Sequence, residues 1–97
     1  RGVVETMIEW AAGHAAPVIS LDVPSGVDST TGHTPGAHVQ AAVTLTLALP
    51  KTGLAVPAAG ELLLADIGIP GEVYRRVGID VAPEMFGGRY RVGLRPI

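Results

Sequence analysis

Residues 3–22 read VVETMIEWAAGHAAPVISLD, and this stretch decides the fold class of the 97-residue chain. Its first half spaces apolar residues three and four positions apart with glutamates between them, which predicts an amphipathic helix over 3–12. Gly13 is a natural end for that helix. The apolar, β-branched run PVISL at 17–21 predicts a buried strand. A helix, a short turn and an apolar strand in this order are typical of an α/β fold with a parallel sheet.

The rest of the chain continues the α/β pattern, with fewer sequence signals for each helix or strand. Two further apolar runs predict strands at 42–49 (AVTLTLAL) and 61–65 (ELLLA), with a helical turn as the alternative for the second run. Residues 23–40 between the strands are rich in Gly, Pro, Ser and Thr, which predicts a loop. A loop of this length is usually functional or mobile. The remaining predictions are one or two helical turns at 71–77 and an edge strand near 89–92.

Composition restricts the class of protein. Hydrophobic residues make up 47% of the chain and charged residues 16%, so we expect the chain to be an excerpt whose surface other protein partly covers. Cysteine is absent, which excludes a disulfide framework, a thiolate zinc site and a catalytic thiol. A chain without cysteine fits a reducing compartment, and we expect a cytoplasmic location.

Membrane and nucleic-acid partners are not expected. The longest apolar run, at 41–50, is far shorter than the ~20 residues that a membrane-spanning helix needs, and we expect no secretory leader. Aromatic residues are 4% of the chain, which argues against a surface that stacks nucleic-acid bases. Residues 1–74 carry a net charge of −5 (two basic, seven acidic) and residues 75–97 a net charge of +3 (five basic, two acidic), which is only a modest basic end.

The candidate site is the stretch DVPSGVD at 22–28. Asp22 directly follows the first predicted strand, and ligands of open α/β sheets bind outside the carboxyl ends of the strands. At such a position Asp22 can act as a general acid or base, or hold a ribose or a cation. Ser25 offers an acceptor oxygen to a hard cation and a donor to a phosphate. The spacing leaves open the alternative that Asp22 caps a turn and Ser25 satisfies the loop backbone.

Lys51 is the only lysine, and it follows the strand predicted at 42–49. If the strands are parallel, Lys51 lies on the same rim as Asp22, where it can pair with a phosphate or with Asp22 itself. The alternative is a solvated loop lysine. Asp66 also follows a strand, and we expect a structural role for it in a turn. Three histidines lack the spacing of a metal site and are expected in surface loops: His14, His33 and His38.

Three ordered motifs resemble one known family. They are LDVPSGVDSTTG at 21–32, AVTLTLALPKTGL at 42–54 and LADIGIP at 64–70. Together they resemble the YjeF N-terminal domain family, the NAD(P)H-hydrate epimerases. The resemblance covers residues 1–78 and only the C-terminal half of that domain, so the Asn- and Gly-rich substrate loop of the N-terminal half lies outside this chain.

The resemblance implies a Rossmann-like, three-layer α/β/α domain with a mostly parallel sheet, of which this chain holds a part. It implies an epimerase that interconverts the R and S forms of hydrated NADH or NADPH, termed NAD(P)HX, so that a dehydratase can use both. The family's aspartate contacts the substrate and is its acid or base, a role that falls on Asp22. The family's serine helps hold a potassium ion, a role that falls on Ser25. Lys51 matches the family's Pro-Lys-x-Gly turn and is a candidate for substrate binding.

The resemblance also implies partners and an alternative. The missing N-terminal half supplies most nucleotide contacts and the other potassium ligands, so we expect this chain alone to be inactive. We expect a homodimer, and we interpret residues 79–97 as a tail or a linker toward a fused NAD(P)HX dehydratase. The alternative is a non-catalytic YjeF-type module for nucleotide binding, dimerisation or protein interaction, since the domain is reused in messenger-RNA decapping enhancers.

Overall fold

The structure is a computed structural model and describes residues 2–81 and 85–94 of the chain. Its elements are, in order, α1 Val3–Ala12, β1 Ile19–Leu21, β2 Val43–Leu47, the 3-10 turns η1 Thr52–Leu54 and η2 Pro57–Ala59, β3 Glu61–Ala65, α2 Gly71–Arg76 and β4 Arg91–Leu94. Helix α1 has the predicted bounds. The strands predicted at 42–49 and 61–65 and the helical turns predicted at 71–77 are confirmed to within two residues at each end.

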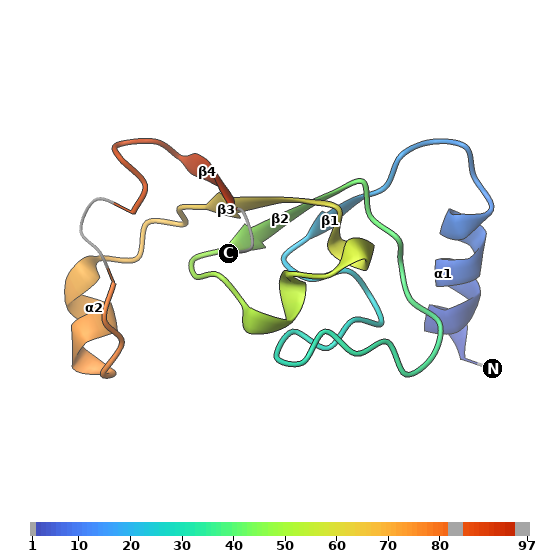
Figure 1. Cartoon of the computed structure of the whole chain (residues 1–97), viewed down its shortest axis with the longest axis horizontal. Helices are drawn as coiled ribbons and strands as arrows, with labels where there is room; N and C mark the ends of the chain where they lie inside the picture. The colour runs from blue at the N-terminus through green and yellow to red at the C-terminus, as the bar shows by residue number, and fades with distance from the viewer. Residues whose placement is uncertain (1, 82–84, 95–97) are drawn as a thin grey trace.

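One mixed sheet carries the four strands in the order β1-β2-β3-β4 (Figure 1). Strands β1, β2 and β3 are parallel, and β4 runs antiparallel to β3. The predicted α/β fold class with a mostly parallel sheet is therefore confirmed, as part of a Rossmann-like domain. The edge strand expected at 89–92 begins two residues later, because its pairing sets Arg91 opposite Ala65 and Leu94 opposite Leu62. The domain boundary after residue 78 stays a prediction, although β4 joins this sheet.

Strand β1 differs from its sequence prediction in burial. Ser20 is its buried residue, whereas Ile19 and Leu21 are 73% and 69% exposed. The strand pairs with β2 on one side, and the described part of the chain places no strand on its other side. An apolar, β-branched run predicts a strand, but it does not reveal whether another element covers that strand. The prediction of a buried strand at 17–21 is thus confirmed for the strand and wrong for its burial.

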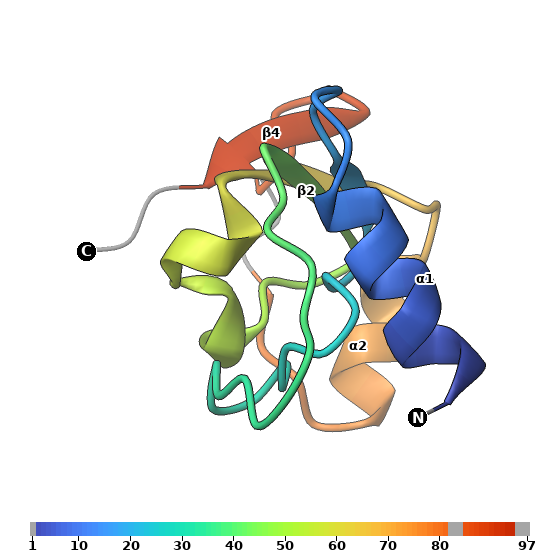
Figure 2. The same ribbon diagram turned by 90° about the vertical axis from the view of Figure 1, so that its right-hand side faces the viewer.

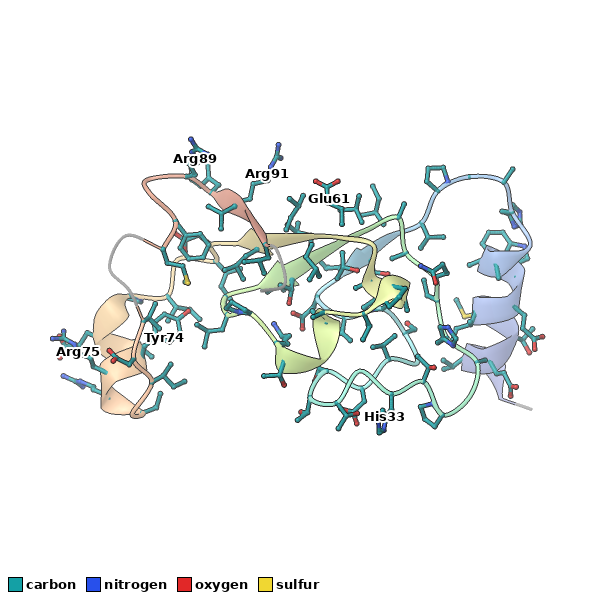
Figure 3. The ribbon with its side chains drawn as sticks, in the orientation of Figure 1. His33, Glu61, Tyr74, Arg75, Arg89 and Arg91 are labelled. Carbon is teal, nitrogen blue, oxygen red and sulfur yellow. The ribbon has the colours of Figure 1, made fainter. Side chains whose placement is uncertain are left out.

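The two faces of the sheet have different surroundings, since successive side chains of a strand point to opposite faces. On one face Thr44, Thr46 and Leu64 are fully buried, beneath the loops that contain η1 and η2. On the other face the described side chains of the sheet are half-buried or exposed, and Figure 3 shows Glu61 and Arg91 pointing outward from it, away from those loops. We call this the open face. The chain therefore covers one face of its own sheet.

The loop over residues 23–40 contains no helix or strand, as predicted, and close backbone contacts hold it in place. The backbone N–H of Gly53 donates to the carbonyl of Ser29 at 2.7 Å, and the hydroxyl of Thr52 donates to the carbonyl of Thr30 at 2.7 Å. A Cβ atom at position 53 would overlap the carbonyl oxygen of Asp28, so only glycine allows this approach. The loop after β1 and the loop after β2 are thus packed together.

Both helices lie at the periphery, with α1 at one end of the sheet and α2 at the other (Figures 1 and 2). Helix α1 buries Ile8, while Val4, Met7 and Trp10 are between 63% and 68% exposed. Exposed apolar residues on this scale are typical of a surface that other protein covers. Among the described residues, no helix has the length and apolar character needed to cross a membrane.

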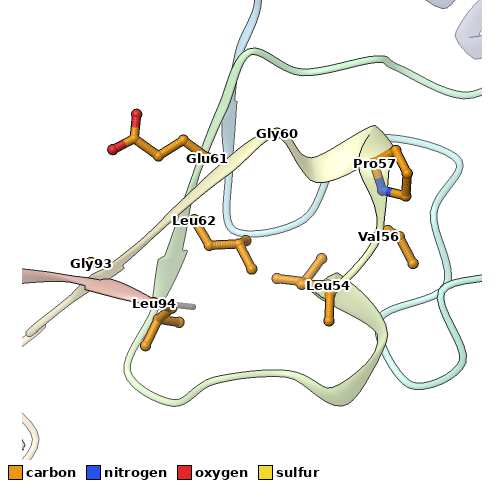
Figure 4. A pocket seen from close by; sticks show the side chains of 9 residues that line it. Leu54, Val56, Pro57, Gly60, Glu61, Leu62, Gly93 and Leu94 are labelled. Atoms are coloured by element: carbon orange, nitrogen blue, oxygen red, sulfur yellow. The ribbon is translucent and has the colours of Figure 1, made fainter. Parts of the chain in front are cut away.

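Leu54, Ala59 and Leu62 form an apolar cluster on the covered face, and an open groove of about 810 Å³ lies beside it (Figure 4). Leu54, Leu62 and Leu94 line it, together with Gly60 and Glu61 at the start of β3. The start of β3 is the amino-terminal end of the parallel strands, whereas ligands of such sheets bind at the carboxyl ends. The groove is therefore separate from the rim on which Asp22 lies.

Candidate functional site at the carboxyl ends of the parallel strands

Asp22 is the first residue after β1 and has a positive φ of 70°. Its backbone N–H donates to the carbonyl of Leu45 on β2 at 2.7 Å, so the chain stays attached to the sheet while it turns into the loop. The left-handed region is uncommon for residues other than glycine, although aspartate enters it more readily than most. The turn places the Asp22 side chain at the carboxyl end of the sheet, as the sequence predicted.

Three donors bind the same oxygen of the Asp22 carboxylate. Oδ1 lies 2.8 Å from Nζ of Lys51, and it accepts hydrogen bonds from the backbone N–H of Leu47 at 3.1 Å and the hydroxyl of Thr46 at 3.2 Å. Within the described residues, Oδ2 makes no hydrogen bond. The Asp22 side chain is 44% exposed. The carboxylate is therefore fixed through one oxygen, and its second oxygen is available to a ligand.

Lys51 lies on the same rim as Asp22 and pairs with it, which is one of the alternatives that the sequence left open. Its ammonium is also within hydrogen-bond distance of Thr46 Oγ1 at 2.8 Å and of the carbonyls of Leu47 at 2.9 Å and Leu49 at 3.1 Å. An ammonium has three protons, so these acceptors inside the chain already use its full capacity. The role of Lys51 in substrate binding stays a prediction, while its contact with Asp22 is a feature of the fold.

This environment favours the charged form of Asp22. The hydrogen bond from Lys51 is the main cause that lowers the pKa of the carboxyl, and the Leu47 amide and the charge of Lys51 lower it further, while partial burial opposes them. With its pKa below the ordinary value of about 3.9, Asp22 is ionised at neutral pH. Asp22 therefore carries a negative charge that can bind a donor group, while its lowered pKa makes it a weaker base than a free aspartate.

Ser25 and Asp28, in the same loop, have different surroundings. The Ser25 side chain is exposed and, within the described residues, its hydroxyl makes no hydrogen bond, while its carbonyl accepts from the N–H of Val39 at 2.8 Å. Oδ1 of Asp28 accepts from the backbone N–H groups of Thr30 at 2.8 Å and Thr31 at 3.0 Å, which lowers the pKa of Asp28. Asp28 thus caps a turn, whereas the Ser25 hydroxyl is available to a ligand.

The other candidates lie away from this cluster or support turns. Asp66 accepts the backbone N–H of Gly68 at 2.8 Å, which confirms its expected turn role. His14 and His33 are exposed and His38 is half-buried. The described residues contain no group of three or more His, Asp or Glu side chains that could hold a metal ion.

Thr46 belongs to the site, and the sequence reasoning missed it. Its hydroxyl contacts both Asp22 and Lys51, although 24 and five positions separate it from them in the chain. A signal was present, because AVTLTLAL places threonines at two alternate positions of an otherwise apolar strand. A polar side chain that must be buried on a strand needs a hydrogen-bond partner. That signal indicates a contact, but it does not name the partner.

Comparisons with known proteins place this site in a family. A sequence model described as "YjeF-related protein N-terminus" matches residues 1–53. An NAD(P)H-hydrate epimerase of Dehalogenimonas lykanthroporepellens is 49% identical over 88 residues, which cover 91% of this chain and 36% of that protein. A bifunctional NAD(P)H-hydrate repair enzyme Nnr of Salinibacter ruber is 40% identical over 80 residues, covering 78% of this chain and 15% of that protein. An NAD(P)H-hydrate epimerase of Weissella koreensis is 40% identical over 75 residues, which cover 71% of this chain and 34% of that protein.

The mostly parallel sheet and its helices define the class of protein, which is part of an α/β domain, and Asp22 lies at the edge of the sheet where such domains usually bind ligands. The chain belongs to the YjeF-related N-terminal family, whose sequence model matches more than half of its residues. It spans about a third of the length of the two epimerases named above, 36% and 34%.

Proposed function

We propose that the protein containing this chain is an epimerase that interconverts the R and S forms of hydrated NADH and NADPH. The observation that carries the proposal is the carboxylate of Asp22, which is ionised, fixed through Oδ1 and accessible at Oδ2. Membership of the YjeF-related family supports it, as do the names of the relatives, which are NAD(P)H-hydrate epimerases and bifunctional repair enzymes.

The chemistry suits a base at this position. To invert the ring carbon that bears the added hydroxyl, its bond to the ring nitrogen must break and form again on the other side. As the bond breaks, its electron pair goes to the nitrogen, and the hydroxyl loses its proton and becomes a carbonyl; the reverse step restores both. An ionised carboxylate can accept that proton as the bond opens and return it as the bond forms. The Oδ2 atom of Asp22 is the oxygen that makes no hydrogen bond within the described residues, so we assign this contact to Oδ2.

We propose that the rest of the epimerase domain packs against the open side of this chain. The free edge of β1, the exposed Ile19 and Leu21 and the exposed residues of α1 support this arrangement. A strand followed by a helix and a parallel strand forms a right-handed crossover, so a strand that preceded α1 would lie beside β1. On this reading the chain alone is inactive, and both the nucleotide pocket and a homodimer belong to the longer protein.

A potassium ion is part of the proposal. The Ser25 hydroxyl is exposed and makes no hydrogen bond within the described residues, so its oxygen is compatible with a cation ligand. One hydroxyl is far from a full shell for a hard cation, and we therefore assign the remaining ligands to the other half of the domain. Bound there, the ion supplies positive charge that offsets the phosphates of the nucleotide. The Ser25→Ala variant should weaken the dependence of activity on potassium.

We also propose a dehydratase as the partner in the same pathway, fused or separate. Several relatives are bifunctional NAD(P)H-hydrate repair enzymes, and this chain covers between 11% and 17% of five of them. An enzyme that accepts a single epimer needs an epimerase to supply that epimer from the other one. The connection to such a domain was predicted at residues 79–97, of which Arg91–Leu94 form β4 of this sheet.

The test is chiral chromatography of (R)-NADPHX incubated with the full-length parent protein, with and without potassium. We expect conversion to the S form, and the Asp22→Asn variant should lower the rate by about 10²–10⁴-fold, which is the usual contribution of a general acid or base. A folded parent that binds the nucleotide without converting it would contradict the epimerase and support a non-catalytic binding module. Normal turnover by a folded Asp22→Asn variant would remove Asp22 from the chemistry.

A further inference from the structure

Strand β2 carries two threonines that have nearly the same surroundings and different partners. Thr44 and Thr46 lie on the same face of the strand, and both are 0% exposed. The hydroxyl of Thr44 donates to the backbone carbonyl of Ala59 at 2.7 Å, which is a structural contact within the core. The hydroxyl of Thr46 donates instead to Oδ1 of Asp22. Thr44 therefore binds a backbone group of the core, whereas Thr46 binds the carboxylate of the candidate site.

The Thr46 hydroxyl uses both its donor and its acceptor capacity in this cluster. It donates to Oδ1 of Asp22 at 3.2 Å and accepts from Nζ of Lys51 at 2.8 Å. Lys51 is in turn fixed by the carbonyls of Leu47 and Leu49. Asp22, Thr46 and Lys51 thus form a closed triangle of polar contacts, since Lys51 also lies 2.8 Å from Asp22 Oδ1. Such a triangle defines one orientation of the carboxylate.

We propose that Thr46 and Lys51 are positioning residues, which hold the Asp22 carboxylate by Oδ1 so that Oδ2 faces the substrate. This inference rests on the proposed epimerase function. Neither residue needs to touch the substrate, because each acts through Asp22. A misplacement of a catalytic group by about 1 Å can lower the rate by 10²-fold, so an interaction that fixes one oxygen of a base has a direct effect on turnover.

The two threonines provide a matched pair of variants for the test in the full-length parent protein. Thr46→Val and Thr44→Val each replace a buried hydroxyl by a methyl group of similar size on the same face of the same strand. We expect Thr46→Val to lower kcat by about 10- to 100-fold with KM changed less than about 3-fold, because the bond that is lost orients the base. Thr46→Ser keeps the hydroxyl and should restore most of kcat. Thr44→Val should lower stability and leave kcat nearly unchanged.

Lys51→Met removes the charge and keeps most of the apolar stem of the side chain. Among the described residues, Lys51 is the only charged side chain in ion-pair distance of Asp22. We expect a larger loss of kcat than for Thr46→Val and a shift of the acid limb of the pH–rate profile to higher pH, because the carboxylate loses its main stabilising partner. Equal kcat values for Thr46→Val and Thr44→Val, or an effect of Thr46→Val on KM alone, would overturn the proposal.

A second measurement separates this inference from the proposed function. An NMR titration of the Asp22 carboxyl carbon in the full-length protein, assigned with Asp22→Asn, reports the environment of the carboxylate without any turnover. We expect Thr46→Val and Lys51→Met to raise its midpoint and Thr44→Val to leave it in place. If the parent shows no epimerisation while these midpoints move, the function fails and the positioning cluster stands. Midpoints that do not move overturn the cluster whatever the activity is.

Discussion

The two faces of one sheet differ sharply in this molecule, although the same strands form both. On the covered face Thr44, Thr46 and Leu64 are completely buried, whereas Ile19 and Leu21 on the other face are 73% and 69% exposed. Both faces carry aliphatic side chains, so hydropathy alone does not explain the difference. The difference in burial arises because the connecting loops lie over only one of the two faces.

Both long loops cross the same face. The loop after β1 and the loop after β2 are tied together by the contacts of Thr52 and Gly53 with Thr30 and Ser29, and they pack over the buried side chains. These loops also contain Asp22 and Lys51, so the same two loops cover the face and carry the candidate site. The comparison shows that this chain fixes the Asp22 carboxylate with its own residues, while Ile19 and Leu21 on the other face stay exposed, as the proposed arrangement of the domain requires.

The largest expected effect on stability is at the centre of the covered face. Leu64 is 0% exposed on β3, and Leu64→Ala in the full-length parent should lower the free energy of unfolding by about 2–5 kcal/mol, because it creates a cavity in a packed core. Urea unfolding followed by circular dichroism measures this loss. A loss below about 1 kcal/mol would show that the loops do not pack tightly over this face.

A smaller effect tests the open face. If the rest of the domain covers Leu21, then Leu21→Ala in the full-length protein should lower the free energy of unfolding by about 1.5–3 kcal/mol, the value of one buried leucine. If the face stays open as it is in this chain, the cost should stay within about 0.5 kcal/mol, as for other surface substitutions. Urea unfolding of the full-length variant beside Leu64→Ala decides between the two outcomes. The second outcome would contradict the proposed arrangement.

The helices, the strands and the position of Asp22 and Lys51 at one edge of the sheet were easier to predict from the sequence than the burial of individual side chains. Helix α1 was predictable because its apolar spacing is local, and the rim shared by Asp22 and Lys51 followed from parallel strands that end at one edge. The exposure of Leu21 was not predictable, since a short apolar run looks the same in a central strand and in an edge strand. The position of β4 depended on its register with β3, which is a non-local property.

The candidate site shows the same division between local and non-local information. The residue types at positions 22, 25 and 51 could be selected from the sequence, since each follows a strand or lies in a loop rich in turn residues. The contact of Thr46 with Asp22 joins residues 24 positions apart, and no sequence period encodes it. Asp22, whose φ is positive, is also bonded to Leu45 and Leu47 on β2, which are more than 20 positions away in the sequence.

The smallest expected effect is the part of the pH dependence of stability that comes from the Asp22–Lys51 pair. The folded state lowers the pKa of Asp22, mainly through the Lys51 hydrogen bond, so the pair stabilises the fold above the unfolded pKa of about 3.9. That contribution disappears as the pH falls through the lower pKa of the folded state. Because Asp22 is 44% exposed, solvent screening limits the contribution to less than about 1 kcal/mol.

The measurement is urea unfolding of the full-length parent and its Asp22→Asn variant between pH 3 and pH 7. We expect the difference in the free energy of unfolding to be constant from pH 5 to pH 7 and to shrink below about pH 4, as the carboxylate of the parent takes up a proton. Subtracting the variant removes the acid dependence of other groups such as Asp28, whose pKa the loop backbone also lowers. A difference that stays constant down to pH 3 would mean that Asp22 and Lys51 do not form this pair in solution.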